Sequence, residues 1–353
     1  MKHHDSSISK IIVDTFNNYG IKSEIIGCTN GVAYTLYEVK VVPGTRMLSV
    51  ASHEDDLAVA LSEEGVRIVA PIPGKTTIGV EVRATNRICI PFDPFFSELE
   101  SSSGVIPFAL GMDVFGNRHV TDLTMCPHLL IAGNQGRGKT TFINSLIHSI
   151  VLTSSPAKVK LALIDTKDIL YSERMEIPNL LVPIITESKT ALDFFDYLFE
   201  EMERRLELLK ARRVRNISEY NEGISEDDRS NQKMPYIVVI VDEYSDLMLE
   251  DGRWFESMIM QIAPKGKTVG IHLVMSTNRC TSDVITGVIK THFPSQIAFS
   301  VSSGLNSRII IDQLGAERLL GWGDFLYCAN DSQVPLRLQG IDMIYKGHCF
   351  SYK

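Results

Sequence analysis

Two patterns of apolar and polar positions divide the 353-residue chain. From about residue 106, short apolar runs alternate with long amphipathic segments. The runs cover residues 129–132, 159–164, 237–241, 271–275 and 296–301. Strands that are apolar on both faces belong to buried parallel sheets, and alternation with helices implies helices on both faces. This part is therefore predicted to be an α/β domain with a doubly wound, parallel-rich sheet.

The first 105 residues follow a different pattern. Apolar positions spaced as on a helix run from Ile8 to Tyr19 and end at Gly20. Short strands with turn signals follow at 32–41, 66–70 and 78–82, with a helix from about Glu54 to Leu61. Mixed helices and short strands indicate a small α+β domain. The serine-rich stretch 101–104 is the best linker, so we expect domains at 1–105 and 106–353.

Composition narrows the class of protein. No apolar run approaches the ~20 residues that a bilayer-spanning helix needs, and the polar N-terminus leads into no signal-peptide core. Six cysteines, at positions 28, 89, 126, 280, 328 and 349, form no C-x-x-C pair, which argues against a zinc site or a disulfide framework. The net charge of −8 excludes a general basic coat for nucleic acid but permits a narrow basic strip or pore. We expect a cytoplasmic protein.

The strongest motif covers residues 133–140, which read Gly-Asn-Gln-Gly-Arg-Gly-Lys-Thr. This is the G-x-x-x-x-G-K-[ST] phosphate-binding loop, and it lies between an apolar strand and an amphipathic helix, as the motif requires. Lys139 is predicted to reach the β/γ-phosphates of ATP, and the Thr140 hydroxyl to bind Mg²⁺. The predicted nucleotide-binding residues are Gly133, Asn134, Gln135, Gly136, Arg137, Gly138, Lys139, Thr140 and Thr141.

A second acidic motif ends the apolar run 237–241. Asp242 is predicted to hold Mg²⁺ through its hydration shell, and Glu243 to orient or deprotonate the attacking water. The alternative is a strand that leads into a helix whose first turn favours acids. The phosphate loop about 100 residues upstream favours the catalytic interpretation.

Two further strand ends carry polar residues. Thr277 and Asn278 follow one strand, where neutral hydrogen bonds could sense the γ-phosphate or hold the water. Asp165 and Lys167 follow another and face the same edge of the sheet. A plain strand-to-loop transition remains the alternative for both pairs.

Blocks along nearly the whole chain, from about residue 20 to 340, resemble the FtsK/SpoIIIE family of DNA translocases. The matching blocks are 37–38, 55–58, 70–75, 109–113, 127–133, 163–167, 201–205, 235–243, 270–273, 283–287, 312–317 and 321–324. The resemblance implies a small α domain packed on a RecA-like β domain. It also implies a homo-hexameric ring around double-stranded DNA, with ATP at the subunit interfaces, in the bacterial cytoplasm.

The same resemblance assigns the DNA contacts. Arg279, Lys290 and Arg308 match pore residues that touch phosphates, an interaction that is independent of base sequence. A surface cation in a local salt bridge is the alternative for each.

Three positions depart from the family pattern. Asn278 replaces a glutamine that is one methylene longer, and Gly304 replaces a pore-facing lysine. Lys267 stands where the family has an arginine that reaches the neighbouring subunit's nucleotide. Lysine cannot make the planar bidentate contact of a guanidinium. We therefore expect slow ATP hydrolysis, or a finger supplied by another side chain.

The leading function is an ATP-driven pump for chromosomal, plasmid or mobile-element duplex DNA. The alternatives are a related ring ATPase that moves protein in secretion, and a ring component that binds ATP with little turnover. The family's membrane-spanning region and its orientation-reading winged-helix domain are not found in these residues. We therefore expect a stand-alone motor or a fragment, recruited to the membrane, if at all, by another protein.

Overall fold

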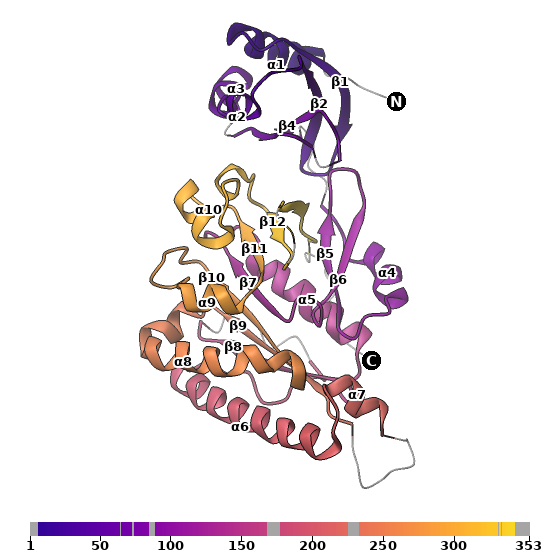
Figure 1. The fold of residues 1–353 in the computed structure, drawn as a ribbon, viewed down its shortest axis with the longest axis vertical. Coiled ribbons are helices and arrows are strands. Elements are labelled where there is room, and N and C mark those ends of the chain that lie inside the picture. Colours follow the sequence, from indigo (N-terminus) through magenta and orange to yellow (C-terminus); the bar gives the residue numbers. More distant parts are fainter. Residues whose placement is uncertain are drawn as a thin grey trace.

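A computed structural model describes residues 6–63, 65–72, 74–84, 89–167, 177–224, 233–330, 332 and 334–342. Two positions discussed above lie outside these ranges: Pro73, which is part of the block 70–75, and Cys349, which is one of the six cysteines. The chain forms a small N-terminal body above a larger one (Figure 1). Within the described part of the chain, no helix combines the length and apolarity needed to cross a membrane.

The small body packs helices against an antiparallel sheet. Its helices are α1 (Ser6–Asn18), α2 (Met47–Ala51) and α3 (Glu54–Leu61). Its strands are β1 (Ser23–Asn30), β2 (Tyr34–Val41), β3 (Arg67–Val69) and β4 (Ile78–Arg83), in the order β1-β2-β4-β3. The apolar stripe of α1 is buried through Ile12 and Phe16. Gly20, at φ +76°, ends the helix as predicted, with the Ile21 amide donating to the Phe16 carbonyl.

The described strands of the larger body form one sheet in the order β6-β5-β13-β12-β11-β7-β10-β9-β8. The five predicted strands are confirmed as β7 (His128–Ala132), β8 (Val159–Asp165), β9 (Tyr236–Asp242), β10 (Ile271–Thr277) and β11 (Ser295–Phe299). These five are mutually parallel. The sequence did not predict the antiparallel extension, which comprises β5 (Pro107–Met112), β6 (Arg118–Asp122), β12 (Asp324–Cys328) and β13 (Leu336–Gln339). The sheet is therefore mixed.

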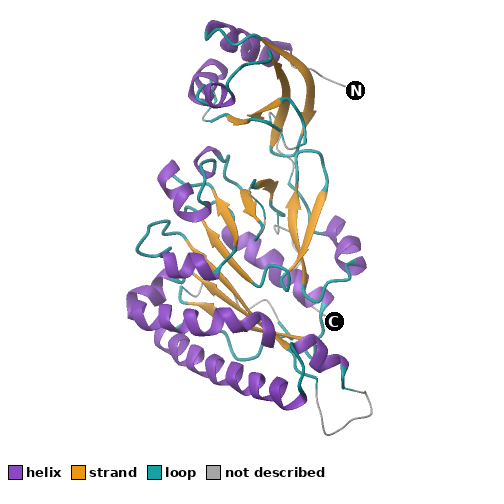
Figure 2. Cartoon of the chain, in the orientation of Figure 1, coloured by secondary structure: helices purple, strands orange, loops and turns teal. Residues whose placement is uncertain are grey.

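Helices cover this sheet (Figure 2). The longer ones are α5 (Lys139–Thr153), α6 (Ser188–Arg212) and α8 (Ser245–Val269). The shorter ones are α4 (Phe96–Ser101), α7 (Ile217–Glu222), α9 (Gly287–His292), α10 (Gly304–Ile311) and the 3-10 turns at Asp93–Phe95 and Ala316–Arg318. Helices α6 and α8 run side by side, where Phe195 meets Phe255 edge to face (Figure 1). Helix α5 carries Phe142 against Phe299 and Phe325. The predicted α/β class, with a small α+β body before it, is confirmed.

The two bodies meet through the ion pair of Glu81 with Arg337 and through an apolar cluster that joins Tyr34 to Val114. Phe92, Phe95 and Leu99 form a cluster with Ala109 of β5 and Ile341, so the segment before residue 105 packs on the larger body. The division at residue 105 remains a prediction.

Among the described residues of the larger body, three histidines are buried. Burial lowers the pKa of His128 to about 3 and the pKa values of His148 and His272 to about 4. In the unfolded chain these imidazoles have a pKa near 6.5, so below that pH the unfolded state takes up protons that the folded state does not. The resulting loss in the free energy of unfolding is absent above pH 6.5 and grows as the pH falls towards 4.

We expect the replacement His272→Asn to reduce the acid sensitivity of the fold. Each buried histidine should lower the free energy of unfolding by about 1.4 kcal/mol between pH 7.5 and 5.5. Asparagine keeps a donor for the Pro127 carbonyl, which His272 Nδ1 contacts at 3.0 Å. Urea unfolding at both pH values measures the difference. If the free energy of unfolding depended on pH identically in the variant and the native chain, the lowered pKa of His272 would be contradicted.

Candidate nucleotide site

The phosphate loop joins β7 to α5 and is fixed at both neighbouring strands. The Gly133 amide donates to the Thr277 carbonyl at 3.3 Å, and the Asn134 amide donates to the Ser300 carbonyl at 3.0 Å. At Gly133, φ is +152°, and an added Cβ would lie 2.6 Å from the Cβ of Phe299. Only glycine fits this close approach of backbone to the next strand.

The Lys139 side chain folds back over the loop. Its ammonium is buried and donates to the carbonyls of Gly133 at 2.6 Å and Asn134 at 2.9 Å. Burial lowers the pKa of Lys139, against the opposing charges of Glu243 and Asp242. A buried cation next to open backbone amides at a helix N-terminus favours an anion in the loop.

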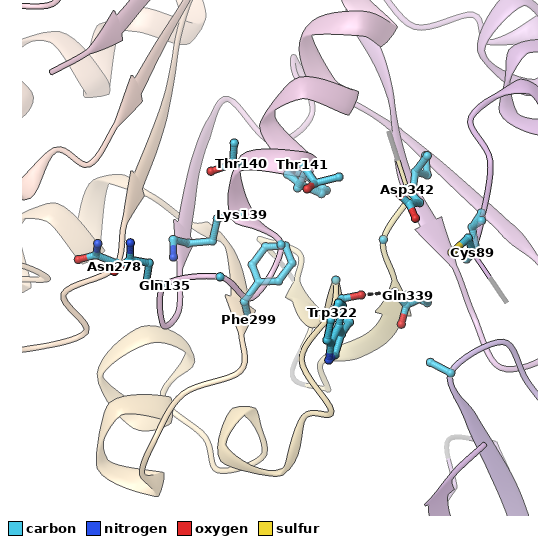
Figure 3. Close-up of a pocket in the computed structure, with 18 of the residues that line it drawn as sticks. Cys89, Gln135, Lys139, Thr140, Thr141, Asn278, Phe299, Trp322, Gln339 and Asp342 are labelled. Atoms are coloured by element: carbon cyan, nitrogen blue, oxygen red, sulfur yellow. Dashed lines mark hydrogen bonds between the residues drawn. The ribbon is translucent and has the colours of Figure 1, made fainter. Parts of the chain in front are cut away.

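A cavity of about 750 Å³ opens beside the loop, which is the size range of small-molecule sites (Figure 3). The residues around its phosphate-loop end are Gln135, Gly136, Gly138, Lys139, Thr140, Thr141, Lys167, Asp242, Glu243 and Asn278. The cavity therefore brings together the phosphate loop, the acids at and just after the end of β9, Lys167 after β8 and Asn278 after β10. The other two polar residues predicted at these strand ends, Asp165 and Thr277, do not line it. Three predicted loop residues, Gly133, Asn134 and Arg137, support the loop but do not line the cavity.

The far side of the cavity was not predicted. It is formed by Ala33 and Arg83 of the small body, Cys89, and the turn that carries Trp322 and Gly323. The Gly323 amide donates to the Arg137 carbonyl at 3.0 Å, which ties this turn to the phosphate loop. No local sequence signal indicates these contacts, because they join segments far apart in the chain.

Asp242 and Thr140 provide oxygen ligands that suit Mg²⁺. Burial raises the pKa of Asp242, and the nearby charges of Asp165 and Glu243 add to the shift. A cation would relieve this concentration of buried negative charge. Among the described residues, no cluster of three or more acids, histidines or cysteines could hold a metal by itself. The residues present therefore fit a Mg²⁺ that the Thr140 hydroxyl would bind and that Asp242 would hold through its hydration shell.

Glu243 is held by several donors. Its Oε1 accepts from Ser245 Oγ at 2.6 Å and Thr277 Oγ1 at 2.7 Å, and its Oε2 accepts from Lys167 Nζ at 3.2 Å. The Asn278 amide lies 3.2 and 3.1 Å from the two oxygens. Burial alone would raise the pKa of Glu243, but these hydroxyls and the ammonium hold it below its usual value.

The backbone of Glu243 is also unusual. Its φ of +56° lies in the left-handed region, which non-glycine residues seldom adopt. Such a conformation costs of order 1–3 kcal/mol and persists where the surroundings impose it. It turns the chain sharply between β9 and α8 and brings the carboxylate into the cavity.

The predicted role of the Asn278 side chain stays a prediction. The residue lines the cavity, and its backbone amide contacts Glu243. Lys267 is exposed in the last turn of α8 and does not line the cavity of its own chain. Its predicted action on nucleotide would therefore be exerted on the cavity of another copy.

The three residues predicted to contact DNA differ in their exposure to solvent. Arg279 and Arg308 are exposed. Lys290 is half-buried, donates to the carbonyls of Arg308 at 3.1 Å and Ile309 at 2.9 Å, and pairs with Asp312 at 2.8 Å. It thus caps the C-terminus of α10 and supports the helix that carries Arg308. At Gly304, an added Cβ would lie 2.6 Å from Leu314, so a longer side chain there requires Leu314 to move.

Solved structures share this fold. The chain superposes on the pCW3 conjugation coupling protein TcpA, in monomer form with ATPγS, with a TM-score of 0.66 at 20% identity over 96% of each chain. It superposes on the cytoplasmic domain of the type VII secretion ATPase EccC of Thermomonospora curvata with a TM-score of 0.59 at 23% identity, over 67% of this chain and 28% of that one. At these identities the likeness establishes the fold alone.

Relatives with closer sequences are named as DNA translocases. The chain is 42% identical over 336 residues to DNA translocase FtsK of Treponema pallidum, covering 95% of this chain and 42% of the relative. It is 41% identical over 328 residues to DNA translocase SftA of Bacillus subtilis, covering 92% of this chain and 34% of the relative. The chain therefore spans less than half the length of these relatives.

Two family profiles match successive parts of the chain. The FtsK alpha domain matches residues 2–83, and the FtsK/SpoIIIE family profile matches residues 97–282, which include the phosphate loop and the acidic pair of β9. These matches agree with the residue blocks that first indicated the resemblance. The chain belongs to the FtsK/SpoIIIE family.

Proposed function

We propose that this chain is an ATPase that moves double-stranded DNA, working as a ring of six copies in the bacterial cytoplasm. The observation that carries the proposal is the convergence of Lys139, Thr140, Asp242 and Glu243 on one cavity. The DNA translocases to which the chain is about 40% identical support DNA as the cargo.

The site residues have distinct roles in the proposed hydrolysis. Loop amides and Lys139 bind the phosphates, and Thr140 and Asp242 hold Mg²⁺. When bound, Mg²⁺ neutralises charge that develops on the phosphate oxygens. Glu243 orients a water and accepts its proton as the water oxygen bonds to the γ-phosphorus. The bond from the γ-phosphorus to the bridging oxygen breaks, which yields ADP and phosphate.

Contact with DNA is proposed to be local. A chain of net charge −8 has no overall attraction for a polyanion, so binding must come from a few cations repeated around the ring. Arg279 and Arg308 are exposed and suited to phosphate contact. Lys290 contributes through its support of α10. Such contacts do not depend on base sequence and weaken as salt rises.

Two other functions would account for part of these observations, and the experiment below distinguishes them from DNA translocation. The fold that the chain shares with a secretion ATPase suits a motor that moves protein. Lysine at 267 and asparagine at 278 suit a ring component with little turnover. Both predict an ATPase rate that does not respond to duplex DNA.

The test is ATP turnover with and without duplex DNA at low and moderate salt. We expect the rate to rise with duplex, and the rise to shrink as salt increases. Lys139→Ala, which removes the phosphate-binding cation, should abolish both the basal and the stimulated rate. Sedimentation with ATPγS and duplex should show six-copy assemblies. A rate that is indifferent to duplex, from a protein that stays monomeric, would contradict the proposal.

A further inference from the structure

Lys167 connects two neighbouring strands at the cavity. It lies two residues beyond the end of β8, and its ammonium contacts Glu243 Oε2 at 3.2 Å, just beyond the end of β9. Asp165 and Asp242 are paired in the register of these strands. This register ends the two strands level with each other, so the residues that follow them, Lys167 and Glu243 among them, start side by side.

The contacts of the described residues already occupy both oxygens of Glu243. A carboxylate offers about four lone-pair positions. The hydroxyls of Ser245 and Thr277, the Asn278 amide and the Lys167 ammonium use them. In this arrangement the carboxylate is poorly placed to accept a hydrogen bond from water. Departure of one of these donors would free a position on the carboxylate for the attacking water.

The donors differ in their freedom to move. Ser245 and Thr277 are fully buried, on α8 and β10, and the Asn278 amide is backbone. Lys167 is 37% exposed and has a flexible four-carbon stem. It also lines the cavity together with Lys139 and Thr140. It is therefore the donor that a ligand in the cavity can draw away.

We propose that Lys167 is a positioning residue that senses the terminal phosphate of ATP. In the nucleotide-free chain its ammonium holds Glu243 Oε2. When a triphosphate occupies the cavity, the ammonium moves to the γ-phosphate and leaves Oε2 free for water. ADP has no γ-phosphate, so the ion pair remains. This inference rests on the proposed ATPase function. It names Lys167 as the group that would couple the catalytic base Glu243 to the substrate ATP.

The test compares the affinities of the full chain for ATPγS and ADP, each with Mg²⁺. In Lys167→Met we expect ATPγS to bind roughly tenfold more weakly, the loss of one charged contact, with ADP affinity nearly unchanged. Lys167→Arg should retain most of the preference. The matched control is Lys160→Met, which removes a lysine at the other end of β8, away from the cavity. Equal effects of Lys167→Met on both nucleotides would overturn the inference.

A crystal structure of the wild-type chain tests the same idea without a variant. With ATPγS and Mg²⁺ bound, the Lys167 ammonium should contact the γ-thiophosphate and no longer contact Glu243. An ion pair that stays intact beside bound ATPγS would overturn the inference and leave the proposed function standing. Absence of ATPγS binding by the wild-type chain would contradict the proposed function as well as this inference.

Discussion

Replacing Glu243 with glutamine should lower the rate of ATP turnover by a factor of about 10²–10⁴, the usual contribution of a general base. Glutamine keeps the size of the side chain and can still accept from Ser245 and Thr277, but it cannot take a proton from water. Binding of ATPγS should therefore persist while phosphate release is lost. Steady-state turnover together with an ATPγS titration separates the two effects.

A matched control is Glu250→Gln, which makes the same change at an exposed position of α8. This control should hydrolyse ATP at the native rate. If Glu243→Gln kept more than half of the native rate, Glu243 would not be the base. The acidic pair of β9 would then serve binding alone.

Replacing Arg337 with leucine should lower the free energy of unfolding by about 3–5 kcal/mol, because it leaves buried carboxylates without their partner. Arg337 is buried and donates to Asp324 through Nε at 3.0 Å and Nη2 at 2.7 Å. It also pairs with Glu81 of the small body and lies 4.1 Å from the ring centre of Tyr34. Burial alone would raise the pKa of Glu81, but Arg337 and Arg67 hold it below its usual value.

The control for Arg337 is Arg318→Leu, which breaks another contact between the two bodies. Arg318 pairs with Asp55, whose side chain is 77% exposed, and lies 3.6 Å from Glu54, whose side chain is 21% exposed, so this change should cost less than Arg337→Leu. Urea unfolding followed by circular dichroism measures both variants. Equal losses would show that the buried network does not hold the two bodies together.

The apolar runs of the larger body predicted its five parallel strands because burial on both faces leaves a continuous pattern. The phosphate loop and the acids of β9 were predicted for a related reason, since each motif directly follows such a strand. By contrast, β1 and β6 are largely half-exposed, and their mixed composition resembles loop. β12 and β13 pair antiparallel at the join between the bodies, a context that no local pattern indicates.

The contacts that assemble the site were harder to predict. Thr277 and Lys167 were visible as polar residues at strand ends, but their shared contact with Glu243 depends on strand order and register. The pairing of Glu81 with Arg337 joins residues 256 positions apart, each of which alone is an ordinary strand residue. The antiparallel extension brings them together, and that extension has no signature in the sequence.

The most direct measurement of the central claim is displacement of a third strand bound at one end of a long duplex. The native chain should release this strand when ATP and Mg²⁺ are supplied, and neither ADP nor the Glu243→Gln variant should support release. The third strand should leave later as the distance from the loading region to it increases. A native protein that hydrolyses ATP and binds duplex, yet never displaces the strand, would contradict the claim that nucleotide cleavage at this cavity drives movement along DNA.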